Sequence, residues 1–169
     1  MKPGFAVWIT GLPASGKSTV TKALVALLVK RGINAAVLES DVLRKIFTPK
    51  PRYDEEERRI FYASMAYVGS LLTDHGVPVI FDATANRRSY RAAARERIAR
   101  FLEVYVDSPL ALCMTRDPKG IYQQGKEGAS ASVPGLQADY EPPEYPDVVI
   151  HGDRETPEDA ARRIIDQLF

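Results

Sequence analysis

A glycine-rich stretch near the N-terminus combines residue types and a spacing that suit the binding of phosphate groups. The stretch Gly11–Ser18 reads G-L-P-A-S-G-K-S and matches the pattern G-x-x-x-x-G-K-[S/T] of a phosphate-binding loop, or P-loop. Its glycines allow backbone conformations in which successive N–H groups converge on one anion. We expect ATP to contact the loop and the residue after it, namely Gly11, Leu12, Pro13, Ala14, Ser15, Gly16, Lys17, Ser18 and Thr19.

Two side chains of the loop are expected to take part in the chemistry. Lys17 would place a positive charge beside the β- and γ-phosphates and act as a catalytic residue, and the hydroxyl of Ser18 would bind Mg²⁺, the expected cofactor. The loop follows an apolar run, Phe5–Thr10, and opens an amphipathic stretch, Lys17–Lys30. A strand before the loop and a helix after it are the context that supports this motif.

Two acidic residues follow later apolar runs and are candidates for the remaining chemistry. Asp41 comes soon after Ala35–Leu38, and Asp82 directly follows Val77–Phe81. Open α/β sheets bind ligands at the carboxyl ends of their strands, so Asp41 would accept the proton of an attacking hydroxyl and Asp82 would support Mg²⁺ through water. In the alternative interpretation, Asp41 is the N-cap of a short helix, Val42–Phe47, and Asp82 only caps or orients a loop.

Apolar runs alternate along the chain with segments of helical periodicity, which is typical of β–α–β units. Because the apolar runs are continuous, we expect parallel strands that are covered on both faces. We predict one domain, residues 1–169, with a three-layer α/β/α P-loop NTPase fold and a mainly parallel five-stranded sheet. The expected strands are Phe5–Thr10, Ala35–Leu38, Val77–Phe81, Phe101–Val106 and Val148–Ile150. The expected longer helices are Lys17–Lys30, Asp54–Asp74, Ser89–Arg100 and one that begins at Thr156.

Residues 120–146 interrupt this alternation with a long segment of little periodicity that contains many glycines and prolines. We interpret the segment as a flexible lid, with a merely disordered insertion as the alternative. A lid suits a kinase, because closure over the site keeps water from hydrolysing ATP. The N-K-x-D motif that reads the base in GTPases does not occur in the sequence.

The overall composition argues against several other classes of protein. A formal net charge of +1 does not suit a broad surface for nucleic acid polymers or anionic membranes. No apolar run approaches the ~18 residues of a membrane span, and the N-terminus does not resemble a signal peptide. The single cysteine, Cys113, permits no intrachain disulfide and is expected to be buried and inert. Together these features predict a cytoplasmic protein.

Several longer motifs resemble those of the adenylylsulfate kinases, which phosphorylate the 3′-hydroxyl of adenosine 5′-phosphosulfate with MgATP. The most specific are E-V-Y-V-D-S-P-L at residues 103–110, R-D-P-K-G-I-Y at residues 116–122 and Y-E-P-P-E at residues 140–144. Asp41 with Arg44 matches the family's D-N-V-R element. The resemblance implies a kinase whose substrates are ATP and adenylylsulfate. Because members of that family are often dimers, a homodimer is also expected.

Cations should surround the polyanionic transition state of phosphoryl transfer. The resemblance implies that Asp41 lies by the acceptor hydroxyl and that Arg44 contacts the acceptor, and Arg58 matches the arginine of the family's D-R-x-x-N element. We assign Arg116 and Lys119 to the ATP side. The residues assigned to the acceptor side are Asp41, Arg44, Arg58, Phe61, Thr84, Asn86 and Arg88.

The acceptor side departs from the family pattern at three places. Phe61 stands where the family has asparagine, Ala83–Asn86 replaces its F-I-S-P segment, and Ala131–Gly135 replaces the basic K-x-F-T-G segment of its lid. The P-loop has no such departure. Two alternatives therefore stay open. One is a related kinase acting on another nucleotide-linked or small-molecule hydroxyl, for example a cytidine diphosphate derivative, and the other is a non-catalytic ATP-binding regulatory protein.

Overall fold

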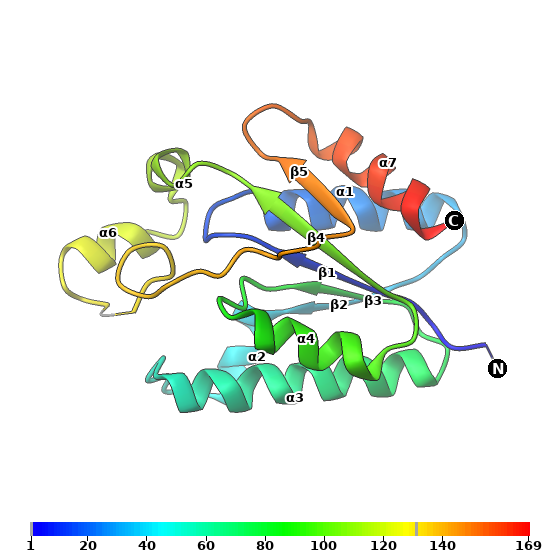
Figure 1. Ribbon diagram of the computed structural model, residues 1–169, viewed down its shortest axis with the longest axis horizontal. Coiled ribbons are helices and arrows are strands. Elements are labelled where there is room, and N and C mark those ends of the chain that lie inside the picture. Colours follow the sequence, from blue (N-terminus) through cyan, green and yellow to red (C-terminus); the bar gives the residue numbers. More distant parts are fainter. Residues whose placement is uncertain (1, 131) are drawn as a thin grey trace.

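The computed structural model describes residues 2–130 and 132–169, which form one five-stranded sheet between two layers of helices (Figure 1). The strand order is β2-β3-β1-β4-β5, and every strand pairing among the described residues is parallel. This confirms the predicted three-layer α/β/α fold. The strands are β1 Ala6–Thr10, β2 Ala36–Glu39, β3 Val79–Asp82, β4 Phe101–Asp107 and β5 Val148–His151. The helices are α1 Lys17–Lys30, α2 Ser40–Phe47, α3 Glu55–Asp74, α4 Arg88–Arg97, α5 Leu110–Arg116, α6 Ile121–Lys126 and α7 Pro157–Leu168.

The central strand β1 leads directly into the P-loop. Ala6 of β1 pairs with Val79 of β3 on one side and with Phe101 of β4 on the other, and the whole of β1 is buried. The chain order of the strands reverses at β1, and ligands bind at such a reversal, beyond the carboxyl ends of the strands. The topology therefore places the P-loop at the middle of the binding edge.

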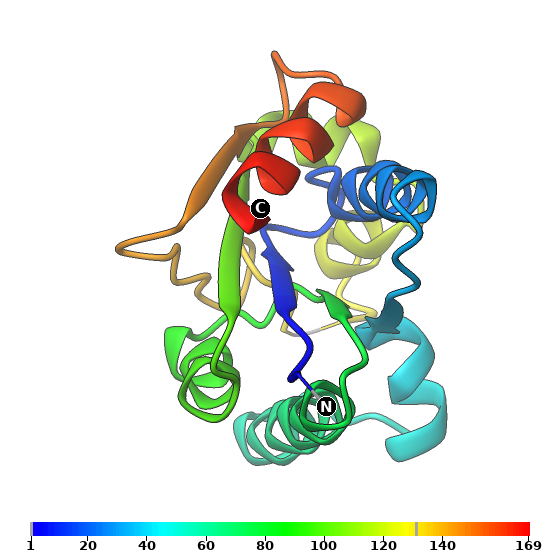
Figure 2. The same ribbon diagram turned by 90° about the vertical axis from the view of Figure 1, so that its right-hand side faces the viewer.

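Helices cover both faces of the sheet (Figure 2). Successive side chains of a strand point to opposite faces. Val7 and Ile9 of β1 accordingly pack in the core cluster shared with α1 and α7, and Ala6 and Trp8 pack in the cluster shared with α3 and α4. Burial on both faces explains why the strands are continuous apolar runs in the sequence.

Side-chain caps determine where α3 and α7 begin. Asp54 accepts a hydrogen bond from the backbone N–H of Glu57 at 2.8 Å, and Thr156 Oγ1 accepts one from the N–H of Asp159 at 3.1 Å. Pro157 occupies the first turn of α7, where a missing N–H costs no helical hydrogen bond. Both helix starts agree with the prediction from the sequence.

Two helices differ from the sequence-based expectation. Helix α4 spans Arg88–Arg97 and ends three residues early, because Ile98 turns to an extended conformation and is buried in the core. Helix α2 begins at Ser40, so Asp41 lies inside its first turn. The N-cap of α2 is Glu39, whose side chain makes no capping hydrogen bond. The alternative role of Asp41 as the N-cap is therefore wrong.

The lid segment, described over residues 120–130 and 132–146, packs against the P-loop through α6 and Val133. The segment contains α6, and its Tyr122 and Val133 belong to a small core cluster together with Leu12. The hydroxyl of Tyr122 donates a hydrogen bond to the carbonyl oxygen of Pro13 at 2.8 Å. This packing disfavours the alternative of a merely disordered insertion, and the predicted movement of the lid stays a prediction.

Cys113 is buried, as the analysis of the sequence predicts. Cys113 has no exposed surface and packs in the same small cluster as Tyr122. Burial raises the pKa of its thiol, which keeps the sulfur in its less reactive, protonated form. Across residues 2–130 and 132–169, no helix combines the length and the apolar character needed to cross a bilayer.

Candidate active site

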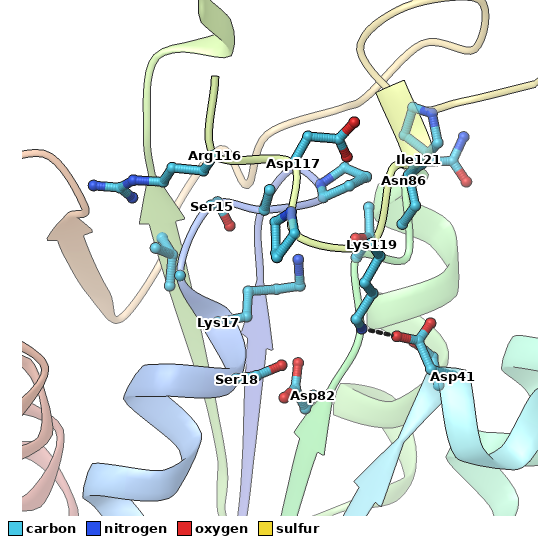
Figure 3. A pocket seen from close by; sticks show the side chains of 18 of the residues that line it. Ser15, Lys17, Ser18, Asp41, Asp82, Asn86, Arg116, Asp117, Lys119 and Ile121 are labelled. Carbon is cyan, nitrogen blue, oxygen red and sulfur yellow. Dashed lines mark hydrogen bonds and ion pairs between the residues drawn. The ribbon is translucent and has the colours of Figure 1, made fainter. Parts of the chain in front are cut away.

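A cavity of about 620 Å³ opens at the carboxyl edge of the sheet, between the P-loop, α2 and the lid (Figure 3). Most of the residues predicted to form the site line this cavity. They are Pro13, Ala14, Ser15, Gly16, Lys17, Ser18, Thr19, Asp41, Arg44, Arg58, Asp82, Thr84, Asn86, Arg116 and Lys119. The predicted residues that do not line it are Gly11, Leu12, Phe61 and Arg88.

The P-loop presents backbone N–H groups to the cavity at the N-terminus of α1. Gly16 precedes α1 with a φ of 108°, a left-handed conformation that favours glycine. The first turn of α1 holds no acidic residue, so the positive end of the helix dipole is free to act on an anion. The Ser15 hydroxyl is buried and finds no hydrogen-bond partner among the described residues. The loop therefore offers several donors to a phosphate group.

Lys17 is held over the loop by the loop's own backbone. Its Nζ donates hydrogen bonds to the carbonyl oxygens of Gly11 at 3.1 Å and Leu12 at 2.8 Å. Burial lowers the pKa of Lys17 to about 8, although the carboxylates of Asp82 and Asp41 act in the opposite direction. A buried cation with only neutral acceptors is poised to gain free energy from a phosphate.

Ser18 and Asp82 meet below Lys17. Figure 3 shows the Ser18 hydroxyl and the Asp82 carboxylate facing the same space, one from the start of α1 and the other from the end of β3. Asp82 is buried, and the parallel pairing of β3 with β1 brings it opposite Ile9. An alcohol and a carboxylate are hard oxygen donors, the kind that Mg²⁺ prefers.

Asp41 and Lys119 form an ion pair across the cavity mouth (Figure 3). Asp41 comes from the first turn of α2, and Lys119 comes from the connection between α5 and α6. The hydrogen bond to Asp41 raises the pKa of the Lys119 ammonium. Both side chains are more than half exposed, so a ligand can reach them and replace either partner.

Arg44 of α2 is a buried cation in the cavity wall. Its guanidinium lies over the ring of Phe61 at 4.1 Å and over the ring of Tyr53 at 4.9 Å. Its Nη1 is 3.5 Å from Oε1 of Glu57. Stacking between aromatic faces fixes the plane of a guanidinium and leaves its edge free to donate hydrogen bonds.

Arg58 connects α3 to the lid. Its Nη2 donates a 2.6 Å hydrogen bond to the carbonyl oxygen of Ser132. Burial lowers the pKa of its guanidinium, and the nearby charge of Arg44 acts in the same direction. Ser132 and Val133 of the replaced lid segment line the cavity, and Ala131 lies outside the described residues.

Phe61 and Arg88 do not take the positions predicted for acceptor contacts. Phe61 is 1% exposed, because its ring points into the core beneath Arg44 and supports that side chain from behind. Arg88 turns away from the cavity, and its Nε donates to the carbonyl oxygen of Pro142 at 2.6 Å while its Nη1 pairs with Glu144 at 2.8 Å. We correct the assignment of both residues accordingly.

Gly11 and Leu12 also lie behind the cavity wall. A side chain at Gly11 would collide with the Val106 carbonyl oxygen, at 2.6 Å from the added Cβ, so glycine lets β1 and β4 approach. Leu12 packs in the small cluster under the lid. Their contribution to the cavity is the pair of carbonyl oxygens that hold Lys17.

Thr84, Asn86 and Arg116 line opposite ends of the cavity. Thr84 and Asn86 belong to the loop after β3 and line the cavity together with Arg58. Arg116 ends α5, and its Nη2 donates to the carbonyl oxygen of Gly152 at 3.1 Å, beyond the P-loop. The cavity therefore extends from the loop after β3 to the end of α5.

Two aromatic residues that line the cavity were missed in the analysis of the sequence, Tyr53 and Tyr62. Tyr62 lies one helical turn after Arg58 in α3, so helical periodicity could have placed both on one face. Tyr53 adopts a left-handed backbone with a φ of 58° in an irregular loop, and no sequence pattern signals that conformation.

Comparisons with known proteins agree with this geometry. The family model for adenylylsulphate kinase matches residues 3–151. An adenylyl-sulfate kinase from Microcystis aeruginosa is 38% identical over 98% of this chain and 91% of its own length. A probable adenylyl-sulfate kinase from Pyrococcus abyssi is 35% identical over 96% of this chain and 93% of its own length.

Solved structures give the same result. The Mycobacterium tuberculosis APS kinase CysC, in complex with AMPPNP and APS, superimposes with a TM-score of 0.93 at 32% identity and covers 99% of each chain. Shikimate kinase from Aquifex aeolicus has a TM-score of 0.61 at 15% identity and shares the fold alone. The motifs quoted from the sequence, the P-loop cavity and these matches lead to one conclusion. The chain belongs to the adenylylsulphate kinase family.

Proposed function

We propose that this chain transfers the γ-phosphate of ATP to the 3′-hydroxyl of adenylylsulfate. The observation that carries the proposal is that one cavity is lined by the P-loop, by Asp41 and by two buried arginines, Arg44 and Arg58. This cavity offers a phosphate-binding site, a general base and cations that can bind an anionic acceptor. The family supports the choice of acceptor, and the M. tuberculosis relative was solved with APS bound.

Asp41 is the proposed general base. The 3′-hydroxyl oxygen attacks the γ-phosphorus, its proton passes to the carboxylate of Asp41, and the bond from the γ-phosphorus to the bridging oxygen breaks to release ADP. In the ligand-free chain that carboxylate is paired with Lys119. ATP would attract the Lys119 ammonium toward its phosphates and so release Asp41 for the acceptor.

Lys17 and Arg116 are the proposed ATP residues outside the loop backbone. Lys17 would exchange the carbonyl oxygens of Gly11 and Leu12 for the β- and γ-phosphates. Arg116 lies at the far end of the cavity, where its flat guanidinium can stack on the base. These positions orient the γ-phosphate toward the acceptor end.

Mg²⁺ is the proposed cofactor, held by the Ser18 hydroxyl and, through water, by Asp82. The oxygen donors fit this ion. Groups of three or more His, Cys, Asp or Glu side chains that could form a protein-only metal site do not occur in the described part of the chain. That agrees with an ion that keeps several waters and binds through the phosphates of its nucleotide. When bound, Mg²⁺ neutralises charge that develops on the phosphate oxygens.

On the acceptor side, Arg44 and Arg58 are proposed to bind the phosphosulfate, with Thr84 and Asn86 beside them. Arg58 would give up the Ser132 carbonyl oxygen to do so. The change from asparagine to Phe61 falls behind Arg44 and leaves the cavity surface there to arginine and tyrosine. The acceptor end therefore keeps its cations despite the departure.

The experiment that tests the proposal supplies the purified chain with MgATP and adenylylsulfate and follows ADP and the 3′-phosphorylated product. We expect product in equal amount to ADP. A panel of other acceptors with free hydroxyls, including a cytidine diphosphate derivative, runs beside it. If another acceptor is phosphorylated and adenylylsulfate is not, the acceptor is wrong; if ATP binds and no acceptor reacts, the chain is a regulatory protein.

Self-association and cellular site complete the proposal. Helix α3 carries an exposed apolar stripe of Ile60, Tyr67 and Leu71, which are 51%, 56% and 47% exposed, and Ile46 of α2 is 66% exposed. Large apolar side chains that gather on one face mark an interaction site. We propose that two copies of the chain pair through this stripe as a two-fold homodimer.

Because the reaction uses ATP, we also propose that the protein acts in the cytoplasm.

A further inference from the structure

The C-terminal part of the lid segment, residues 138–146, is bound to the loop that follows β3. Figure 1 shows this segment returning toward β5 past the start of α4. The N–H of Glu141 donates to the carbonyl oxygen of Asn86 at 2.8 Å, and the Asn86 side chain donates to the carbonyl oxygen of Asp139 at 2.9 Å. The carboxylate of Glu141 accepts the N–H of Arg88 at 2.8 Å, at the start of α4. The Y-E-P-P-E motif thus has a contact role that its sequence does not reveal.

Arg91 of α4 lies at the centre of this contact and is 1% exposed. Its Nη1 donates to the carbonyl oxygen of Ala85 at 2.6 Å, and its Nη2 donates to the carbonyl oxygen of Glu141 at 2.7 Å. Its Nε pairs with Glu103 of β4 at 2.7 Å. One rigid, planar group therefore joins the loop after β3, the C-terminal part of the lid segment and the sheet.

Ala85 adopts a conformation that an alanine rarely takes unaided. Its φ is 42°, in the left-handed region that favours glycine. Its N–H donates to the hydroxyl of Tyr62 at 3.2 Å, and its carbonyl oxygen is held by Arg91. The neighbours Thr84 and Asn86 line the acceptor end of the cavity. The shape of that wall therefore depends on groups that hold Ala85 in a strained conformation.

We propose that Arg91 is a positioning residue for the acceptor. It does not line the cavity, and it acts by holding the Ala85 peptide and by fastening the C-terminal part of the lid segment to the same loop. The term acceptor here rests on the function proposed above. A residue that only stabilises the fold would lower the activity for ATP and acceptor alike, whereas a positioning residue of this loop affects the acceptor first.

Arg95 provides a matched control one turn along the same helix. It also pairs with Glu103, at 3.5 Å, and with Asp147 at 2.8 Å. It forms no hydrogen bond to Ala85 or to Glu141 among the described residues. Both arginines are thus linked to the same carboxylate, and of the two only Arg91 forms a hydrogen bond to the loop after β3.

The first experiment compares Arg91→Lys with Arg95→Lys. Lysine keeps the charge near Glu103 but cannot form the forked contacts of a guanidinium. We expect the KM for the acceptor to rise roughly tenfold or more in Arg91→Lys, since charge-assisted hydrogen bonds are lost, with the KM for ATP within about twofold of wild type. Arg95→Lys should keep both constants. Equal effects of the two variants, or equal changes in both KM values, would overturn the proposal.

The second experiment needs no acceptor and so separates this inference from the proposed function. Hydrogen exchange is measured by mass spectrometry on the ligand-free proteins. Arg91→Lys should raise the exchange rate in peptides covering residues 83–90 and 138–145 and leave the exchange rate of the P-loop peptide unchanged. If the exchange rates of both segments stay at the wild-type values, the positioning role is overturned. If Arg91→Lys fails to fold, Glu103→Gln loosens the same guanidinium and should give the same pattern, and its absence would count equally against the proposal. If wild type ignores adenylylsulfate but the exchange pattern appears, only the proposed function fails.

Discussion

Replacing Asp41 by asparagine should separate catalysis from stability. The variant keeps the size of the side chain and removes the group that would accept the proton of the hydroxyl. The loss of a positioned general base lowers kcat by about 10²–10⁴-fold. Asp41 and Lys119 are 57% and 59% exposed, so their ion pair is screened by water and its loss should cost at most about 1 kcal/mol of unfolding free energy.

The assay couples ADP release to NADH oxidation at saturating ATP and acceptor, and denaturant unfolding measures stability on the same samples. Asp166→Asn, an exposed acid on α7, serves as the control for the change in charge and should leave kcat unchanged. The reasoning is refuted if Asp41→Asn keeps more than about a tenth of the wild-type kcat, since a base in this role contributes at least about 10²-fold. It is also refuted if the loss of activity follows a loss of folded protein.

Four further predictions concern charge, packing and assembly. Burial lowers the pKa of Lys17 to about 8, and phosphates favour its protonated form, so ATP binding should take up a proton near pH 8.5 and weaken above about pH 8. Calorimetry in buffers of different ionisation enthalpy measures the proton uptake. The variant Lys17→Met should abolish it. In the ligand-free chain the same lowered pKa makes the unfolding free energy rise with pH between about 8 and 10.5, the ordinary value for lysine. Gly69→Ala should destabilise the fold by about 1–3 kcal/mol in denaturant unfolding, although alanine is the better helix former, because the added Cβ would lie 2.1 Å from Cζ of Phe81. Tyr67→Glu should convert the proposed homodimer to a monomer in light scattering, with Asp166→Asn as the unaffected control; a wild-type monomer would contradict the proposal.

The ATP side could be predicted from the sequence because it is built from contiguous residues. Strand β1, the P-loop and α1 follow one another within Ala6–Lys30, so one motif and two periodicities define their geometry. Asp82 was placed by the same reasoning, since the end of a buried parallel strand must reach the same edge as the P-loop. For these residues, the order of the segments along the chain was sufficient to predict their positions.

The acceptor side could not be predicted in the same way, because four separate segments form it. The orientation of Arg88 is decided by Pro142 and Glu144, which lie more than fifty positions away in the sequence. The left-handed conformation of Ala85 depends on hydrogen bonds from α3 and α4. Neither long-range contact leaves a period or a motif in the sequence around these residues.

Phe61 illustrates how such contacts change the meaning of a departure from a family pattern. Asparagine would offer an amide at this position, and its replacement by phenylalanine at first suggested an altered acceptor contact. The ring instead lies 4.1 Å from the Arg44 guanidinium and is shielded from the cavity by it. A cation held against an aromatic face keeps its charge and its outward N–H groups. The substitution therefore changes how Arg44 is supported, while the group that lines the cavity there is still an arginine.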